Sequence, residues 1–183
     1  MKQYRVGIIG CGPRAEYHAE ALRQLPGVEI AGAADLAADR LKAFCDRWEI
    51  ENRYLSAGQL LETQKLDLVS IVTLPPAHRA LVEQCAAAGV PAINMEKVAA
   101  YDVASMDAML AACRRSGALF TVNHQMRFMP QFQALRKLVR AGRLGELRFI
   151  RAGSRGNLVE QGTHTVDQML FVNDDQPAEW VLG

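Results

Sequence analysis

The sequence has no large excess of charge of either sign, no long apolar run and no closely spaced cysteines. Its 183 residues include 21 basic and 20 acidic side chains, for a formal net charge of +1. Such a balance provides no field to attract nucleic acid or an anionic membrane. No apolar run approaches the roughly 20 residues of a bilayer span, and the N-terminus lacks a signal-peptide pattern. We therefore expect a cytoplasmic protein that binds neither nucleic acid nor membrane.

The cysteines and histidines suggest neither disulfides nor a metal. None of the four cysteines is in a C-x-x-C spacing, and each lies in or beside a predicted core element: Cys11, Cys45, Cys85 and Cys113. This pattern favours reduced, buried thiols. The four histidines are too scattered along the chain to indicate a metal site. We therefore expect no metal.

The most informative stretch is the apolar run at residues 4–9 and the glycine-rich turn that follows it. A helical pattern comes next, so the context is strand, tight turn and helix, in which G-x-G-x-x-A predicts dinucleotide binding. Gly10 allows the turn, Gly12 lets a pyrophosphate approach the backbone, and Ala15 lets the helix pack closely on the strand. N–H groups at the helix start then face the phosphates. The alternative is a glycine turn that binds nothing.

A second apolar run, residues 28–34, ends at Asp35. Asp35 lies about twenty residues past the motif, where a carboxylate would bind the ribose 2′-hydroxyl of a dinucleotide. The next basic residue is Arg40, so we expect no basic side chain to await a 2′-phosphate. The sequence therefore favours NAD as the cofactor, and NADP stays open.

Predicted helices and strands alternate as far as residue 122. Helices are expected at 37–48, at 56–62, from the paired prolines to Gly89, and from a cap at Asp102 to Gly117, and strands at 66–72, 90–95 and 119–122. Strands that are apolar on both faces and alternate with helices are typical of a parallel sheet covered on both sides. The predicted fold class is therefore α/β, with a doubly wound Rossmann domain over residues 1–122.

After residue 123 the pattern changes. A polar connector at 123–128 precedes a helix around residues 132–139, a predicted strand at 147–152, and a helix that opens within residues 160–167. We interpret residues 123–183 as the incomplete beginning of an α+β substrate and oligomerisation domain.

Taken together, these motifs resemble the Gfo/Idh/MocA family of NAD(P)-dependent oxidoreductases. The resemblance includes the glycine loop, a match to T-P-P-x-x-H at residues 73–78, Glu96-Lys97, the connector at 123–128, and G-x-H-x-x-D beginning at Gly162. It implies an oxidoreductase that transfers a hydride between a nicotinamide cofactor and a polyhydroxylated substrate, such as a sugar or cyclitol. It also implies a homo-oligomer.

The resemblance suggests roles for individual residues. Lys97 would hold the substrate hydroxyl, His164 would act as general base because its ordinary pKa is near neutrality, and Glu160 would orient the ring or bind a substrate hydroxyl. A solvated lysine at a strand end and a structural histidine are the alternatives. Asp167 is expected on the site wall, paired with a basic residue. The predicted cofactor contacts are Gly10, Cys11, Gly12, Pro13, Arg14, Ala15, Asp35, Thr73, Leu74, Pro75, His78, Glu96, Lys97 and Asn123, with His124 as a further candidate.

The sequence departs from the family pattern in three places. Val98 replaces the proline of Glu-Lys-Pro, Glu160 replaces an aspartate, and the chain ends where an open sheet is expected to begin. We therefore expect this chain to bind NAD(H), to lack dehydrogenase activity and to self-associate. Two alternatives stay open: an inactive dinucleotide-binding module, and a methyltransferase, in which Glu96-Lys97 and G-x-H-x-x-D would have no role.

Overall fold

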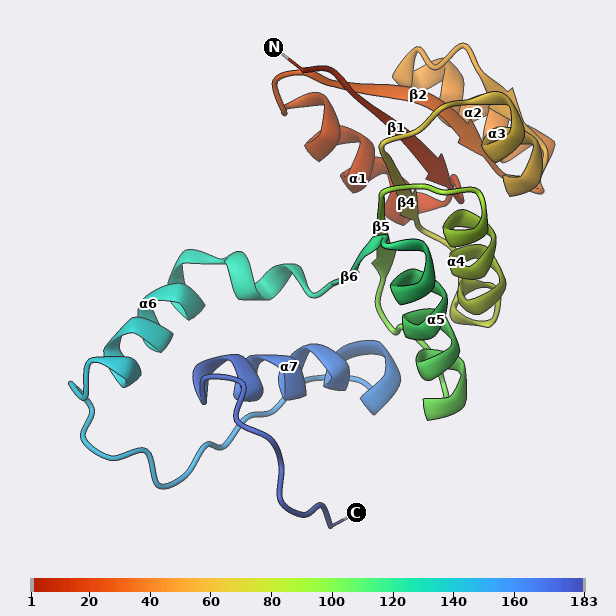
Figure 1. The fold of residues 1–183 in the computed structure, drawn as a ribbon. Helices are drawn as coiled ribbons and strands as arrows, with labels where there is room; N and C mark the ends of the chain where they lie inside the picture. Colours follow the sequence, from red (N-terminus) through yellow and green to blue (C-terminus); the bar gives the residue numbers. More distant parts are fainter. Residues whose placement is uncertain (1, 183) are drawn as a thin grey trace. The chain divides into compact units, whose positions relative to one another are not determined.

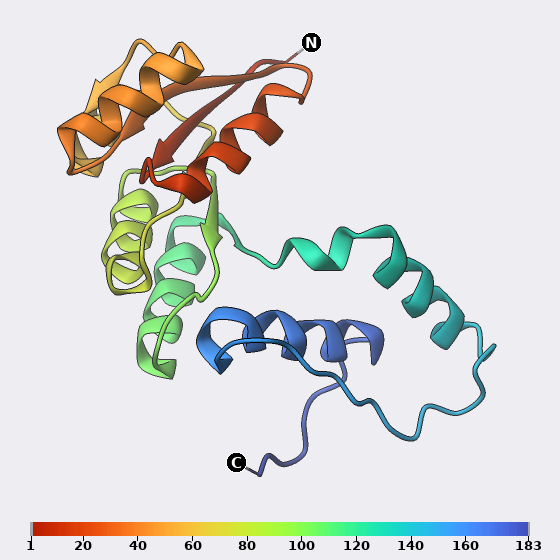
Figure 2. The ribbon, with the colours of Figure 1, turned by 180° about the vertical axis from the view of Figure 1, so that it is seen from behind.

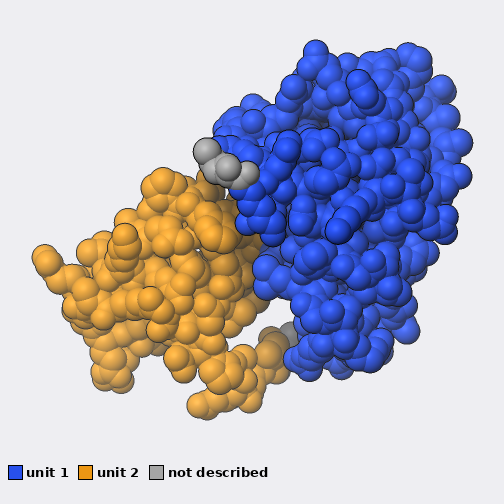
Figure 3. Space-filling view, turned by 45° about the horizontal axis from the view of Figure 1, so that its top comes forward, with its two compact units in different colours: residues 1–123 blue, residues 124–183 orange. Residues whose placement is uncertain are grey.

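The computed structural model describes residues 2–182, apart from the side chain of Glu160. The chain divides into two compact units, residues 1–123 and residues 124–183, coloured separately in Figure 3. The division falls one residue after the domain boundary predicted from the sequence. Each unit is described on its own below.

The first unit alternates strands and helices along the chain (Figures 1 and 2). Its elements are β1 (Tyr4–Ile9), α1 (Pro13–Arg23), β2 (Val28–Ala34), α2 (Ala38–Trp48), β3 (Arg53–Tyr54), α3 (Ala57–Thr63), β4 (Leu68–Ile71), the short 3-10 helix η1 (Pro75–Ala77), α4 (His78–Ala87), β5 (Ala92–Glu96), α5 (Val103–Ser116) and β6 (Leu119–Asn123). The six strands form one parallel sheet in the order β3-β2-β1-β4-β5-β6. This is the doubly wound Rossmann order, and it confirms the predicted fold class.

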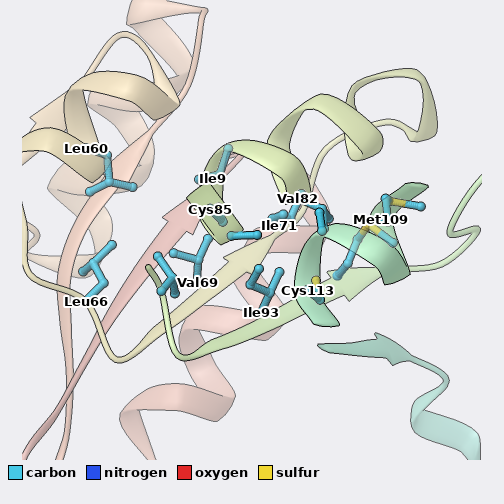
Figure 4. Packing of buried hydrophobic residues seen from close by; sticks show 14 of the residues in the cluster. Ile9, Leu60, Leu66, Val69, Ile71, Val82, Cys85, Ile93, Met109 and Cys113 are labelled. Atoms are coloured by element: carbon cyan, nitrogen blue, oxygen red, sulfur yellow. The ribbon is translucent and has the colours of Figure 1, made fainter. Parts of the chain in front are cut away.

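The core lies on both faces of the sheet, because successive strand residues point to opposite sides. Ile8 packs with α1 and α2 in a cluster that includes Phe44, whereas the adjacent Ile9 packs with α3, α4 and α5. Figure 4 shows this second cluster, in which Val82 and Met109 lie against the strands. Burial of both faces explains why the strands are continuous apolar runs.

The predicted helix boundaries have identifiable causes. Ser56 accepts a hydrogen bond from the Gln59 N–H (3.2 Å) at the start of α3, and Asp102 accepts one from the Ser105 N–H (2.7 Å) at the start of α5. Gly117 ends α5 with a φ of +75°, a left-handed conformation that glycine adopts without strain. The cap at Asp102 and the stop at Gly117 are thus confirmed.

Helices and irregular segments make up the described part of the second unit. Its elements are the 3-10 helix η2 (Gln125–Phe128), α6 (Pro130–Arg140), the π-helix η3 (Leu158–Gly162) and α7 (Thr163–Val172). The strand predicted at residues 147–152 is wrong, because these residues have no regular structure. A strand needs neighbouring strands to satisfy its backbone, and no other described segment of this unit is extended into one.

Candidate functional site

A cavity of about 550 Å³ opens at the carboxyl ends of β1, β2 and β4, within the first unit. The glycine loop, the end of β2 and the segment after β4 line it. This edge lies where the strand order reverses, between β1 and β4, and open parallel sheets bind their ligands at such a point. Predicted cofactor contacts on its wall are Gly10, Gly12, Pro13, Arg14, Asp35, Thr73 and Leu74.

The two loop glycines serve different purposes. Gly10 has a φ of +93°, and a Cβ there would lie 2.6 Å from the Val72 carbonyl oxygen, so the turn itself requires glycine. Gly12 has an ordinary φ of −75°, and a Cβ there would meet no described atom within 4 Å. The fold therefore does not need glycine at position 12. The space over it opens on the cavity, where a phosphate could approach the backbone at the start of α1.

Asp35 directly follows β2, and both of its carboxylate oxygens accept hydrogen bonds from the protein. Oδ2 accepts hydrogen bonds from the Cys11 N–H (2.8 Å) and Arg40 Nε (2.8 Å), and Oδ1 accepts from the Ala37 N–H (2.8 Å) and Arg40 Nη2 (2.6 Å). Burial alone would raise the pKa of Asp35, but the hydrogen bonds lower it by a larger amount. The pKa of Asp35 therefore lies below its ordinary value. Arg40, the next basic residue in the sequence, is brought back against Asp35 by the first turn of α2, a contact that the sequence did not indicate.

The hydroxyl of Thr73 is a buried polar group on the cavity wall. Its Oγ1 atom has no hydrogen-bond partner among the described residues. A buried hydroxyl without a partner is costly, and Thr73 brings this unmet hydrogen-bonding capacity to the cavity wall. The open space over Gly12, the unpartnered Thr73 hydroxyl and the start of α1 together fit a dinucleotide.

Cys11 contributes to the site through its backbone. Its N–H binds Asp35, while its thiol is buried with Sγ 3.8 Å from the Ala34 carbonyl oxygen. Burial, with further contributions from Cys45 and Asp35, raises the pKa of the Cys11 thiol to about 12. A thiol of this kind is protonated at neutral pH, which makes it a poor nucleophile.

Several other predicted cofactor residues lie off the cavity wall. Ala15 is fully buried in the core, consistent with close packing of α1 on the sheet. His78 is also fully buried, with Nε2 3.1 Å from the Thr73 carbonyl oxygen and Nδ1 3.2 Å from that of Ala99. Pro75 opens η1. His78 holds the segment that carries Thr73, and contact of these three residues with a cofactor stays a prediction.

A buried polar network joins α1 to three strands of the sheet. His18 on α1 lies with Nδ1 2.8 Å from Ser70 Oγ on β4 and Nε2 2.9 Å from Glu96 Oε1 on β5. Asn123 on β6 donates to the same Glu96 oxygen (2.7 Å). Burial alone would raise the pKa of Glu96, but the hydrogen bonds with His18 and Asn123 lower it by a larger amount. The pKa of Glu96 therefore lies below its ordinary value. Because Lys97 follows Glu96 directly, the network fixes the strand end that carries it.

His18 is not among the functional residues predicted from the sequence. A polar side chain on an otherwise apolar helix face was the available signal, since such a group needs a buried partner. At the same strand end, the Lys97–Val98 peptide bond is cis, at the position where the family pattern has proline.

In the second unit, the motif residues of two segments come together. The ring of His164, which is 5% exposed, meets that of His124 edge to face, with centroids 5.5 Å apart. Asp167 accepts from Arg127 Nε (2.8 Å) and lies 2.7 Å from its Nη2, and His124 Nδ1 is 3.9 Å from the same carboxylate. The predicted pairing of Asp167 with a basic residue is confirmed, and Arg127 is that residue.

The predicted catalytic residues are divided between the two units. Lys97 belongs to the first unit, at the end of β5, and His164 belongs to the second, in the first turn of α7. The side chain of Glu160 lies outside the described part of the chain, although its backbone is in the π-helix η3. Their joint action on a substrate therefore stays a prediction.

Comparisons with known proteins agree with the fold. D-apiose dehydrogenase of Paraburkholderia graminis is 38% identical over 145 residues, which cover 79% of this chain and 38% of the relative. Myo-inositol 2-dehydrogenase of Thermotoga maritima is 26% identical, over 82% of this chain and 45% of the relative. The crystal structure of an Agrobacterium radiobacter oxidoreductase in complex with NAD+, L-tartaric acid and magnesium superposes with a TM-score of 0.85 at 28% identity, covering 93% of this chain and 55% of that one. The chain thus spans about half or less of these relatives.

The first unit also matches a protein-family model along almost its whole length. Residues 4–124 match the model described as an oxidoreductase family with an NAD-binding Rossmann fold. The matched region contains the glycine loop, Asp35, Thr73 and Glu96-Lys97, which are the residues around the cavity and the end of β5. The family match leaves no support for the methyltransferase alternative. The chain belongs to the Gfo/Idh/MocA oxidoreductase family.

Proposed function

We propose that this chain provides the NAD-binding part of a dehydrogenase that acts on a polyhydroxylated substrate, either a sugar or a cyclitol. The observation that carries the proposal is the cavity at the strand ends, which is lined both by Gly12, with open space over it, and by Thr73, whose hydroxyl has no partner among the described residues. The substrate class is supported by the names of relatives, which include D-apiose and myo-inositol 2-dehydrogenases.

The residues on the cavity wall divide the binding of a dinucleotide among them. The loop from Gly10 to Arg14 would receive the pyrophosphate at the start of α1, Asp35 marks the ribose end, and Thr73 is part of the wall that follows β4. When bound, the nicotinamide supplies the hydride acceptor or donor, while the protein binds and orients. Since all these residues are in the first unit, we expect cofactor binding to depend mainly on that unit.

We assign the acid–base chemistry to Lys97 and His164. The ammonium of Lys97 would hold the substrate hydroxyl and stabilise the developing alkoxide, and an imidazole nitrogen of His164 would take the hydroxyl proton. Glu160 would orient the His164 ring or bind a second hydroxyl. Half-buried His124, beside His164, and Asp167, held by Arg127, would complete that wall.

We further propose a cytoplasmic location and a homo-oligomeric state. All four cysteines are buried, unpaired thiols, which is usual for a reducing compartment. Within residues 2–182, no helix is both long and apolar enough to cross a bilayer. Self-association is supported by exposed apolar side chains in the second unit, such as Phe149 and Leu158. Light scattering tests it.

Calorimetric titration with NADH, and with S-adenosylmethionine as a control, tests cofactor binding. We expect NADH to bind and the control ligand not to, and the reverse would refute the proposal. Turnover is tested separately with NAD+ and a series including D-apiose and myo-inositol, following NADH absorbance. In any form of the protein that catalyses the reaction, Lys97→Ala should lower kcat by about a hundredfold without lowering the affinity for NADH. This is the effect expected for loss of a positioned acid–base group. NADH binding without turnover would favour the inactive-module alternative.

A further inference from the structure

The ribose end of the cavity presents a guanidinium rather than a carboxylate. The side chain of Asp35 is 3% exposed, whereas that of Arg40 is 52% exposed, and both residues line the cavity. Asp35 already accepts four hydrogen bonds from the protein, two of them from Arg40. A ligand that enters this end therefore meets Arg40 first.

The charges at this end of the cavity do not repel an anion. The charge of Asp35 is balanced by that of Arg40, and Arg14 in the glycine loop adds a second cation to the wall as a whole. Among the described residues, Arg40 forms hydrogen bonds through Nε and Nη2, both to Asp35, which leaves Nη1 available. A guanidinium already oriented by a carboxylate loses little freedom when it binds a phosphate oxygen.

We propose that Arg40 allows the 2′-phosphate of NADPH to bind at this end of the cavity, so that the chain accepts both NADH and NADPH. This inference rests on the proposed dinucleotide binding. An unpaired Asp35 would repel a 2′-phosphate, but here Arg40 compensates its charge. Ser56 lines the same cavity, and its hydroxyl accepts the cap bond of α3 while keeping its own hydrogen to donate.

The first test needs no substitution. Calorimetry on the unmodified chain compares NADH with NADPH, and 5′-AMP with 2′,5′-ADP, which isolates the adenosine end. We expect the dissociation constant of NADPH to lie within about tenfold of that of NADH, and 2′,5′-ADP to bind more tightly than 5′-AMP. The preference for the phosphorylated probe should weaken as salt is raised, because exposed charges are screened.

The second test uses matched arginine variants of α2. Arg40→Gln should shift the ratio of NADPH to NADH affinity towards NADH by about tenfold or more, the value of a hydrogen bond between charged groups. Arg40→Lys keeps the positive charge but loses the paired N–H donors of the guanidinium. It should therefore shift the ratio of NADPH to NADH affinity by a smaller factor. Arg47→Gln is the control, because Arg47 lies on the same helix, pairs with Glu16 and is absent from the cavity wall. It should leave the ratio unchanged.

The outcomes separate this inference from the proposed function. If NADH binds but NADPH is more than about tenfold weaker, or if Arg40→Gln leaves the ratio unchanged, the role of Arg40 is refuted while dinucleotide binding stands. If neither dinucleotide binds, the proposed function fails and this inference fails with it. Circular dichroism melting of each variant shows that a change in ratio comes from a folded chain.

Discussion

The buried contact between His18 and Glu96 predicts a large effect of a single substitution. Their side chains are 9% and 8% exposed, and Nε2 lies 2.9 Å from Oε1. Replacing His18 with leucine fills a similar volume but removes the hydrogen bonds to Glu96 and Ser70. The Glu96 carboxylate then stays buried with Asn123 as its remaining donor in the network. The first unit should therefore lose much of its stability.

The size of the loss follows from the partners that remain. A hydrogen bond to a buried charged group contributes about 1.5–3 kcal/mol. Because Asn123 still donates to Glu96 but the hydrogen bond between His18 and Ser70 is lost as well, we expect His18→Leu to cost about 3 kcal/mol, at the upper end of this range. With a urea m-value of about 1–3 kcal/mol per molar, the unfolding midpoint should fall by about 1–3 M.

Urea unfolding measures this cost. A Trp180→Phe background leaves Trp48 as the reporter, and Trp48 lies in the first unit. The exposed pair of Arg79 and Glu83 on α4 provides the control, since Arg79→Ala should cost less than about 0.5 kcal/mol.

The double variant His18→Leu/Glu96→Leu adds a second check. It should recover much of the loss, because two apolar side chains can replace a buried hydrogen-bonded pair at little cost. A His18→Leu protein within about 0.5 kcal/mol of the unmodified chain would refute the reasoning.

Two further predictions concern stability. Asp102→Ala should lower the stability of the first unit by about 1 kcal/mol in the same assay, because α5 loses its N-cap. The lowered pKa of Glu96 contributes stability above its unfolded value of about 4.5, and this is lost as the pH falls through the folded pKa. Urea unfolding from pH 6 to pH 3 should therefore show a smaller acid loss in Glu96→Gln, and an unchanged pH slope would contradict this.

The parts of the fold that local chemistry determines could be predicted from the sequence. Continuous apolar strands, the cap at Asp102 and the stop at Gly117 depend on neighbours within a few residues. The glycine loop is of the same kind, because a tight turn before a helix restricts which residues fit. These features located the cavity at the correct edge of the sheet.

The pairings that complete the site depend on distant residues. His18 and Glu96 are 78 residues apart, and only the parallel order of β1, β4 and β5 brings α1 against the end of β5. The link between Arg127 and Asp167 spans 40 residues in the same way. Arg40 and Asp35, whose contact was not predicted, are much closer in sequence. Their contact nevertheless depends on how the first turn of α2 folds back towards the end of β2. Residues 147–152 have strand character in sequence, yet no described segment pairs with them.

The two glycines of the loop separate folding from binding, and they yield the final prediction. Gly12→Ala should leave the fold intact, because φ is −75° and the added Cβ meets no described atom within 4 Å. Its stability should be unchanged or higher by up to about 1 kcal/mol, since alanine restricts the unfolded chain. The methyl group would nevertheless occupy the space over the loop, so NADH affinity should fall by about tenfold or more.

Gly10→Ala is the matched control, because it changes the fold itself. Its φ of +93° and a Cβ only 2.6 Å from the Val72 carbonyl oxygen make alanine unfavourable there, so stability and NADH affinity should fall together. Thermal melting and calorimetry on both variants give the comparison. If Gly12→Ala binds NADH as tightly as the unmodified chain, phosphate does not approach the backbone at position 12. The cavity would then hold its ligand in another way, because the glycine at position 12, which folding does not require, would have no role in binding either.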